Sequence, residues 1–353
     1  MRPRVILVAP NMENPGGQAV QARSLADELA KEGYEVALLA VNPRFPLGLR
    51  WLRRVPLART LINQALYLPS LWRLRHADVV HVFSASYWSF LLAPVPALSA
   101  GRWLGKRVVL NYHSGEAEDH LARWRRWLRP FLRLADEIVV PSEYLQKTFG
   151  RHGYRTRVLR NVVDTSRFRF RERSPLRPRL ICTRSLEANY RVGDVLEAFA
   201  VVCRSRPEAT LTLAGTGAEE RRLRALAAPF GDRVQFVGRV EPAAMPALLD
   251  GADLFVNASV VDNQPVSILE AFAAGLAVVS TAAGGIPSLI RHDETGLLVP
   301  LRRPDLLAAA ILDLLEHPAR AADLARRARQ EVDAYSWRAV RRGWEAVYVG
   351  SGA

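Results

Sequence analysis

The sequence predicts an α/β protein with two domains, and three observations support this prediction. The length of 353 residues corresponds to about two domains of ordinary size. Residues 254–258 and 277–281 are short apolar, β-rich runs on either side of a helical pattern at 265–272, which predicts a strand, a helix and a strand. The composition, 49% hydrophobic and 24% charged, is that of a globular protein with enough apolar residues for two cores.

The chain begins with the same alternation of elements. A strand is predicted at residues 4–8 and a helix at 19–31, and the loop between them holds Gly16 and Gly17. Glycine in such a loop lets the backbone approach a phosphate, as at the start of a Rossmann-like unit. The loop lacks the GxGxxG pattern, so an ordinary turn is the alternative.

Further strands are predicted in the first domain. They cover residues 35–41, 78–83, 107–112, 137–141 and 156–159. His113 follows the strand at 107–112 directly, and a residue at the carboxyl end of a strand in an α/β domain is well placed to face a ligand cleft. A lone histidine is more often structural. Four neighbouring residues could hold a hydroxyl acceptor, and nothing in the sequence selects among them: Glu116, Glu118, Asp119 and His120.

Two stretches of the first domain are both basic and aromatic. Residues 36–77 contain no acidic side chain, and seven arginines alternate there with tryptophan, tyrosine and leucine: Arg44, Arg50, Arg53, Arg54, Arg59, Arg73 and Arg75. A helix at 121–133, kinked at Pro130, would place arginines on one face and five apolar residues on the other: Leu121, Trp124, Trp127, Leu128 and Phe131. Such a helix is typical of proteins that lie on a membrane surface.

The alternative is that these tryptophans pack on the first domain and that the arginines are simply solvated. We favour docking on an anionic membrane surface. The net charge of +14, carried almost wholly by arginine, suits partners that bear phosphate. Nucleic acid is not an expected partner, because neither stretch contains a recognisable binding module.

The second domain is predicted to begin after a polar, proline-bearing linker at residues 169–178. A strand at 179–183 leads to Arg184, whose planar guanidinium suits a diphosphate. The next strand runs into Gly215 and Gly217, without the third glycine of a dinucleotide fingerprint.

The helix predicted from Pro265 is the best candidate for an anion site. The free backbone N–H groups of Val266 and Ser267 would lie at the carboxyl end of the preceding strand, where a helix N-terminus favours a diphosphate. Glu270, a turn further on, could accept hydrogen bonds from sugar hydroxyls, and Asp262 lies on the loop before the helix. Together they describe a site for a nucleotide that carries a polyol. The alternative is that Glu270 complements the helix dipole and Asp262 is a turn residue.

This segment resembles the signature of a known family. The acid at Asp262, seven intervening residues, Glu270 and the runs AFAAGLAVVST and GGIP are similar to the signature of retaining glycosyltransferase family 4, the glycosyl transferases group 1. The resemblance implies the GT-B fold, in which two Rossmann-like domains face each other across a cleft. It further implies an acceptor domain at 1–168, a nucleotide-sugar domain at 179–335 and a C-terminal helix at 336–353 that crosses back onto the first domain.

The resemblance also implies roles for single residues. Glu270 is expected to bind the ribose hydroxyls, and Asp262 to take the place of a family glutamate that faces the donor sugar. Arg184 is expected to stabilise the leaving group, and His113 to lie near the donor sugar and the acceptor. Four glycines belong to loops expected near the donor: Gly16, Gly17, Gly215 and Gly217.

The chain departs from the family pattern at two places. Asp262 is one methylene shorter than the family's glutamate. The family usually has a lysine five or six residues after the arginine, but Asn189 and Tyr190 occupy those places and Arg191 follows. Either Arg191 substitutes as a donor-binding cation or the second charge is missing.

The implied reaction is a retaining, hexosyltransferase-type transfer from a nucleoside-diphosphate sugar to a carbohydrate or glycolipid acceptor, in bacterial surface polysaccharide or glycolipid synthesis. No cofactor is expected. Because the chain has no Asp-x-Asp and no metal-ligand spacing, we expect a metal-independent enzyme whose leaving-group charge is met by arginine and helix N–H groups. The alternatives are a non-catalytic nucleotide-sugar-binding GT-B protein, a sugar-nucleotide epimerase and, last, a nicotinamide-dependent oxidoreductase, which neither glycine loop fits.

The expected location follows from what the sequence lacks. Cys182 and Cys203 have neither disulfide nor metal spacing and are typical of thiols in a reducing compartment. No segment has the form of a secretory signal or of a transmembrane helix. We expect a cytoplasmic protein, peripheral on the inner membrane. The residues identify neither the base, the sugar nor the acceptor.

Overall fold

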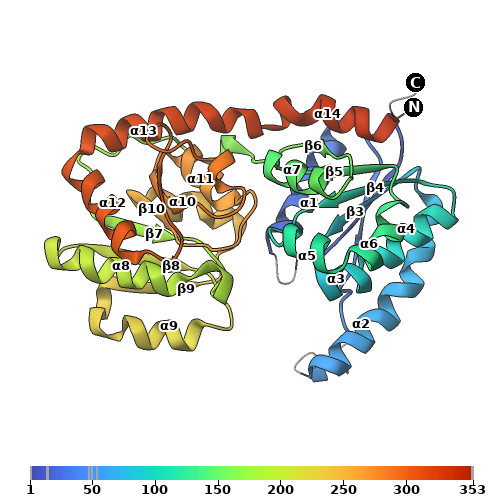
Figure 1. Cartoon of the computed structure of the whole chain (residues 1–353), viewed down its shortest axis with the longest axis horizontal. Coiled ribbons are helices and arrows are strands. Elements are labelled where there is room, and N and C mark those ends of the chain that lie inside the picture. The colour runs from blue at the N-terminus through green and yellow to red at the C-terminus, as the bar shows by residue number, and fades with distance from the viewer. Residues whose placement is uncertain (1, 13–15, 47, 49–50, 53–54, 351–353) are drawn as a thin grey trace. The chain divides into compact units, whose positions relative to one another are not determined.

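The computed structural model describes residues 2–12, 16–46, 48, 51–52 and 55–350, so Arg50, Arg53 and Arg54 of the basic stretch lie outside the described residues. The chain divides into two compact units, Met1–Val162 with Trp337–Ala353 (unit 1) and Val163–Ser336 (unit 2). Each unit contains one six-stranded parallel sheet between helices, as the α/β prediction requires (Figure 1). Within the described ranges, no helix is both long and apolar enough to span a bilayer.

The sheet of unit 1 has the strand order β2-β1-β3-β4-β5-β6. The strands are β1 (Val5–Ala9), β2 (Val36–Ala40), β3 (Val79–Ser84), β4 (Arg107–Tyr112), β5 (Glu137–Val140) and β6 (Arg157–Val158). The central strands β1 and β3 are buried along their whole length, because helices cover both faces of a parallel sheet. Alternate side chains of β1 enter different cores: Ile6 and Val8 one, Val5 and Leu7 the other.

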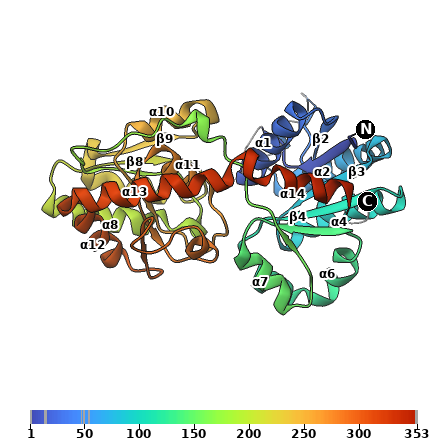
Figure 2. The same cartoon turned by 90° about the horizontal axis from the view of Figure 1, so that it is seen from above.

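Two layers of helices cover this sheet. One contains α1 (Gly17–Lys31) and the C-terminal α14 (Trp337–Val349), whose Val340 and Trp344 pack with α1 against the strands. The predicted return of the C-terminal helix to the first domain is therefore confirmed, and Figure 2 shows α14 against β4. The other layer contains α2 (Pro56–Ser70), η2 (Leu71–His76), α3 (Tyr87–Leu92), α4 (Pro94–Trp103), α5 (Ala117–Arg123), α6 (Arg125–Leu132) and α7 (Glu143–Arg151).

The single helix predicted at 121–133 is wrong, because the structure has two. The backbone leaves the helical region at Trp124 (φ −104°, ψ 14°), which separates α5 from α6, and Pro130 lies inside α6. Trp127 was predicted to share an apolar face with Leu128. Leu128 is buried but Trp127 is exposed, so the predicted face is wrong as well.

The sheet of unit 2 has the order β12-β11-β10-β7-β8-β9. Its strands are β7 (Arg179–Cys182), β8 (Thr210–Ala214), β9 (Val234–Gly238), β10 (Leu254–Asn257), β11 (Ala277–Thr281) and β12 (Leu297–Val299). Its α-helices are α8 (Val192–Ser205), α9 (Glu220–Ala227), α10 (Met245–Asp250), α11 (Val266–Ala274), α12 (Pro304–Glu316) and α13 (Pro318–Val332). The strand, helix and strand predicted at 254–281 are β10, α11 and β11, so this prediction is confirmed.

Short 3₁₀ turns complete unit 2. They are η3 (Thr165–Arg167), η4 (Ala188–Tyr190), η5 (Ala228–Arg233), η6 (Pro242–Ala244), η7 (Ile286–Ser288) and η8 (Asp333–Tyr335). The chain enters unit 2 at Val163, whose N–H donates to the carbonyl of Tyr335 at 3.0 Å. Because the strands within each unit are parallel, their carboxyl ends share one edge of the sheet, where ligand sites form in such folds.

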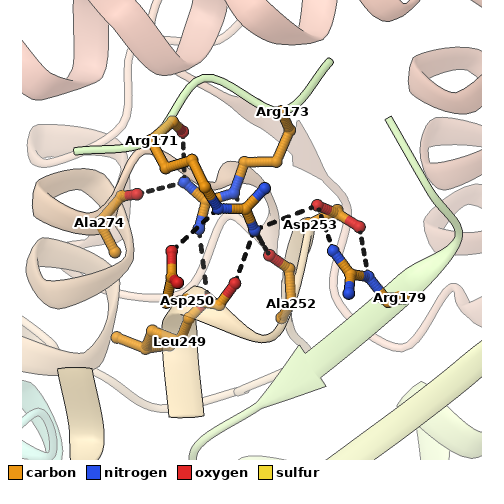
Figure 3. Close-up of polar contacts among 8 residues, drawn as sticks. All are labelled: Arg171, Arg173, Arg179, Leu249, Asp250, Ala252, Asp253 and Ala274. Atoms are coloured by element: carbon orange, nitrogen blue, oxygen red, sulfur yellow. Dashed lines mark hydrogen bonds and ion pairs between the residues drawn. The ribbon is translucent and has the colours of Figure 1, made fainter. Parts of the chain in front are cut away.

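Residues 169–178, predicted as a linker, contain a buried arginine that belongs to unit 2. The Arg173 side chain donates to the carbonyls of Leu249 and Ala252, each at 3.2 Å, and also to that of Ala274 (Figure 3). These carbonyls lie at or just beyond the C-terminal ends of α10 and α11, where helix carbonyls lack partners. Burial lowers the pKa of Arg173 to about 10. The neighbouring Arg171 and Arg179 hold the buried carboxylate of Asp253.

Candidate active site

Three of the predicted site residues meet at the carboxyl edge of the sheet in unit 2. Arg184 follows β7, Asp262 lies on the loop after β10, and Ser267 is in the first turn of α11. One terminal nitrogen of Arg184 forms an ion pair with the Asp262 carboxylate, and the other donates to Ser267 Oγ at 3.2 Å. Only 11% of each charged side chain is exposed. The arginine is thus held in a sheltered, fixed position.

Tyr190 also contributes to this cluster, and sequence reasoning missed its contact. The Arg184 guanidinium lies over the Tyr190 ring, 4.1 Å from its centroid, in a cation–π contact. The η4 turn that carries Tyr190 is tied to the Asp262 loop, since Val260 N–H donates to Asn189 O at 2.9 Å. The only signal in the sequence was an aromatic residue where the family usually has a lysine.

Gly215 and Gly217 fix the loop that carries Arg184. A Cβ atom on Gly215 would lie 2.1 Å from the Arg184 carbonyl oxygen, and one on Gly217 would lie 2.3 Å from that of Leu186. Gly215 also has a φ of +153°, which few other residues adopt. The loop is secured by the hydrogen bond from Leu186 N–H to Thr216 O at 3.0 Å. Both glycines, predicted to approach the nucleotide, are thus required by this close contact between backbones.

Gly284 and Gly285 fix the loop that carries Asp262 in the same way, through close contacts between backbones. Cβ atoms there would lie 2.0 Å from the carbonyl oxygen of Asp262 and 2.2 Å from that of Asn263, and Gly285 N–H donates to Asp262 O at 3.1 Å. The GGIP run was part of the predicted signature, but neither glycine was assigned a role. Its pairing with the Asp262 loop is a long-range contact that local patterns do not specify.

The N-terminus of α11 has free hydrogen-bond donors. Pro265 is the N-cap residue and offers no capping side chain, and the first turn contains no acid. Within the described chain, the N–H groups of Val266 and Ser267 have no acceptor. Free donors and the helix dipole together favour an anion at this position. Because Arg184 contacts Ser267, an anion there would meet both the helix and a guanidinium.

Glu270 lies on the same helix. It is the fifth residue of α11, beyond the first turn, which argues against a simple helix-dipole role. The described residues provide its carboxylate with no hydrogen-bond donor, and burial raises its pKa to about 7, although Arg167 acts in the opposite direction. Such a carboxylate retains its full capacity to accept hydroxyl hydrogen bonds.

Arg191, the candidate substitute for the family's lysine, pairs with Asp194 of α8, the helix that begins directly after it. Its Nε and a terminal nitrogen donate to the two carboxylate oxygens of Asp194 at 2.9 and 2.6 Å. These bonds raise the pKa of Arg191. The residue is also the N-cap of α8 in a left-handed backbone conformation (φ 46°). A guanidinium in this arrangement is already committed to a carboxylate, unlike a free lysine.

His113 lies at the carboxyl edge of the sheet in unit 1. It follows β4, its N–H donates to Ser84 O at 3.2 Å, and its ring stacks on Phe83 with centroids 5.3 Å apart. Nε2 is buried and has no partner among the described residues. Burial lowers its pKa to about 4, so the ring is neutral at pH 7. A neutral imidazole can donate from one nitrogen and accept at the other.

The structure distinguishes the four residues that follow His113. His120 is buried and structural, because its nitrogens are bonded to Tyr112 Oη at 2.9 Å and to Tyr87 N–H at 3.0 Å. Glu118 pairs with Arg151 and Asp119 with Arg123, both at 2.7 Å. Glu116 remains, with no partner for its carboxylate in the described part of the chain.

Tyr87, which sequence reasoning did not consider, has a left-handed backbone (φ 55°) at this edge of unit 1. For a non-glycine residue this conformation costs about 1–3 kcal/mol, and such strain is often found at functional sites. Two contacts hold it in place: its N–H donates to His120 and its hydroxyl donates to Asp119.

Gly16 and Gly17 differ from the glycines of unit 2. A Cβ atom at either would meet nothing within 4 Å, and neither needs a positive φ. Nothing in the described chain therefore requires glycine there, and their role toward the donor stays a prediction. No group of three or more His, Cys, Asp or Glu side chains in the described ranges is arranged to hold a metal ion.

Comparison with known proteins identifies the family of the chain. Residues 177–317 match the family described as glycosyl transferases group 1, and residues 15–167 match Glycosyltransferase Family 4. Glycogen synthase of Mycobacterium tuberculosis is 29% identical over 366 residues, covering 95% of this chain and 84% of the relative. A GDP-mannose-dependent alpha-(1-6)-phosphatidylinositol monomannoside mannosyltransferase of the same species is 33% identical over 195 residues, half of each chain.

Among solved structures, Anabaena HepE in complex with UDP-glucose superposes with a TM-score of 0.73 at 19% identity, covering 97% of this chain and 98% of HepE. At that identity the likeness establishes the GT-B fold alone. The family matches and the glycogen synthase relative add the activity. The chain therefore belongs to the group 1, family 4 glycosyltransferases and transfers a sugar from a nucleotide-sugar.

Proposed function

We propose that the enzyme transfers a hexosyl group from a nucleoside-diphosphate sugar to a hydroxyl acceptor, with retention of anomeric configuration and without a metal ion. One observation carries the proposal: Arg184, Ser267 and the free N–H groups of α11 converge at one edge of unit 2, with Glu270 further along the helix. Donors fixed before reaction stabilise charge that develops on a leaving diphosphate, and no cation beyond the protein is needed.

Arg184 is the principal cation in this proposal. The Tyr190 ring and the Asp262 carboxylate fix its guanidinium, while its buried Nε has no partner among the described residues. A phosphate oxygen at the start of α11 would compete with Asp262 for the guanidinium, leaving Asp262 to face the donor sugar. Asp262 thus orients Arg184 before the donor binds. Replacing it by asparagine should lower kcat while the affinity for the nucleoside diphosphate persists; loss of that affinity instead would contradict this role.

Glu270 is proposed to bind the ribose hydroxyls. Hydrogen bonds to a charged acceptor contribute about 1.5–3 kcal/mol, so Glu270→Gln should weaken donor binding about tenfold or more. Titration calorimetry with UDP and GDP would measure this. The two bases are the first to test, because UDP-glucose is bound by the solved neighbour and GDP-mannose is used by one relative. Glu294→Gln, a surface glutamate of the same unit, is the matched control, and equal affinities for both variants would refute the assignment.

On the acceptor side, His113 and Glu116 are proposed to hold the incoming hydroxyl. The neutral ring and the unpaired carboxylate both lie beyond β4, and both can accept a hydrogen bond. We propose a carbohydrate or glycolipid acceptor in bacterial surface polysaccharide or glycolipid synthesis, with the enzyme working at the inner membrane surface. The support is that one relative is named for a phosphatidylinositol mannoside and another for glycogen.

A direct experiment tests the whole proposal. The protein is incubated with UDP-glucose or GDP-mannose and an alkyl glycoside acceptor, with and without EDTA, and the product anomer is assigned by NMR. We expect one donor to be consumed equally in both conditions and the product to keep the donor's anomeric configuration. Activity that EDTA abolishes would overturn metal independence, and an inverted product would overturn retention.

A further inference from the structure

The exposed tryptophans of this protein gather in unit 1. Five of the eight tryptophans of the chain are between 53% and 76% exposed: Trp51, Trp72, Trp88, Trp103 and Trp127. In unit 2 the exposed large apolar residues are only Leu226, Val237 and Leu301, counting the described residues. Exposed aromatic side chains gathered on one part of a surface indicate a binding function.

Four of these tryptophans belong to a single layer of helices. Trp72, Trp88, Trp103 and Trp127 lie on η2, α3, α4 and α6, which bury their other sides in one core on the same face of the sheet (Figure 1). On α6, for example, Leu128 is buried in that core while its neighbour Trp127 is exposed. The tryptophans therefore project from the outer side of this layer.

Ring contacts connect some of these exposed tryptophans to one another and to neighbouring aromatic and cationic side chains. The rings of Trp72 and Trp103 lie 6.3 Å apart, and Arg75 lies over the Trp72 ring at 5.1 Å. Trp88 packs edge-on against Trp124, with centroids 5.5 Å apart. Aromatic and cationic groups are interleaved here, as the basic stretch of the sequence suggested. This pairing of an apolar body with a positive charge suits the boundary between lipid headgroups and acyl chains.

A basic groove of about 940 Å³ runs between α6 and the beginnings of β5 and β6. Five arginines line it: Arg125, Arg129, Arg133, Arg155 and Arg157. The first three are spaced four residues apart, which places them along one side of α6. Like charges at this spacing destabilise a helix, and a bound anion would relieve that repulsion.

Most of these arginines have no counter-charge among the residues that the structure describes. The groove contains two acids, but Glu137 pairs with Arg157 and Asp136 with Arg102. Within the described chain, no carboxylate pairs with the other four: Arg125, Arg129, Arg133 and Arg155. On α9, by contrast, Arg224 pairs with Glu220 of the same helix. The groove therefore concentrates uncompensated positive charge in a concave surface.

The groove is distinct from the catalytic edge of unit 1. It lies where β5 and β6 begin, at Glu137 and Arg157, whereas His113 follows the end of β4. Because the strands are parallel, beginnings and ends lie at opposite edges of the sheet. The arginines of the groove thus have no place in the chemistry proposed above.

We propose that this side of unit 1 docks on an anionic lipid bilayer, with headgroup phosphates in the α6 groove and the exposed indoles in the interfacial region. Lipid is favoured over nucleic acid because the tryptophans surround no recognisable nucleic-acid module, while arginine flanked by indole is typical of interfacial binding. This inference rests on the membrane location proposed above and deepens it by naming the docking surface, and it does not depend on the sugar transfer.

Cosedimentation with vesicles tests the proposal on the full chain. Vesicles of equimolar phosphatidylglycerol and phosphatidylcholine are compared with pure phosphatidylcholine, and we expect binding to the first only. The variant R125Q/R129Q/R133Q should bind about a hundredfold more weakly, since each arginine at an anionic surface contributes about fivefold. The matched control R221Q/R338Q/R342Q removes the same charge from exposed positions on α9 and α14, outside this helix layer, and should bind like the parent protein.

Three further measurements make the result decisive. Bromine-labelled lipid should quench the tryptophan fluorescence of the parent protein, and less so that of Trp127→Ala. Circular dichroism and transfer to a water-soluble acceptor should be unchanged in all variants, so failure of lipid docking and failure of the proposed chemistry are separable. Equal loss in both triple variants, no preference for the anionic vesicles, or tighter binding to a single-stranded RNA oligonucleotide than to lipid would each overturn the proposal.

Discussion

Three arginines of unit 2 are each held by a specific carboxylate, whereas in the described chain the three along α6 of unit 1, Arg125, Arg129 and Arg133, are not. Arg184 pairs with Asp262, Arg191 with Asp194 and Arg179 with Asp253. On α6, three successive arginines along one side have no carboxylate in the described chain. The same residue type therefore serves two purposes in one protein.

The difference lies in how precisely each charge is placed. An arginine fixed by a carboxylate and an aromatic ring is oriented before its ligand arrives, which suits a diphosphate at a defined position. Free arginines on a surface helix supply charge without a fixed geometry, which suits a fluid array of headgroups. Single substitutions in unit 2 should thus have large effects, and single substitutions on α6 small ones.

The largest effect is expected for Arg173, the arginine buried in unit 2. Arg173→Met removes a charged donor from at least three carbonyls, and each hydrogen bond to a charged group contributes about 1.5–3 kcal/mol. We expect a loss of about 3 kcal/mol or more, seen as a fall of roughly 6 °C in the midpoint of thermal unfolding. Arg129→Met on α6 should change stability by less than about 0.5 kcal/mol. Equal losses of stability in Arg173→Met and Arg129→Met would contradict the difference between the two groups of arginines.

The next effect concerns catalysis and separates the two arginines of the candidate site. Arg184→Ala should lower kcat by about a hundredfold to a thousandfold, the range for loss of one preorganised transition-state donor. Arg191→Ala should cost less, because Arg184 contacts Ser267 at the start of α11, whereas Arg191 pairs with Asp194 of α8. Initial rates at saturating donor provide the measurement. A larger loss of kcat for Arg191→Ala than for Arg184→Ala would indicate that Arg191 takes the place of the family's lysine.

A smaller effect is the pH dependence that Glu270 introduces. Burial raises its pKa to about 7, so the folded state binds the proton more tightly than the unfolded state. Its favourable contribution is therefore complete in acid and disappears as pH rises toward and through 7. Relative to the parent protein, Glu270→Gln should be more stable at pH 8, and this advantage should vanish near pH 4. Thermal unfolding of both proteins across this range measures it, and a constant difference would contradict the raised pKa.

The smallest effect is expected at His113. Because burial lowers its pKa to about 4, the ring stays neutral through the physiological range. The pH profile of kcat/KM should show no inflection near 6.5, where an ordinary histidine titrates. His113→Asn, which keeps one donor and one acceptor, should retain more activity than His113→Ala. An inflection near 6.5 that disappears in His113→Asn would contradict a neutral role.

Local sequence pattern determined the elements that carry the candidate site. Short apolar runs and a proline at a helix start define β10, α11 and β11, because strand and helix periodicity and helix capping act over a few residues. The position of Arg184 at a strand end followed in the same way. The return of the C-terminal helix was implied by family resemblance, which carries tertiary information that periodicity lacks.

Only the tertiary structure decided which of these residues meet. The ion pair between Arg184 and Asp262 joins positions 78 apart in the chain, and the glycine contacts that hold both loops are equally remote. The tertiary structure also assigned His120 to the core and left the Glu116 carboxylate without a partner among the described residues. On α6, it turned Trp127 outward and Leu128 inward, where amphipathic spacing predicts that the two share one apolar face. Side-chain periodicity specifies which residues share a face, but the packing of distant elements decides whether that face is covered, paired or left to a partner.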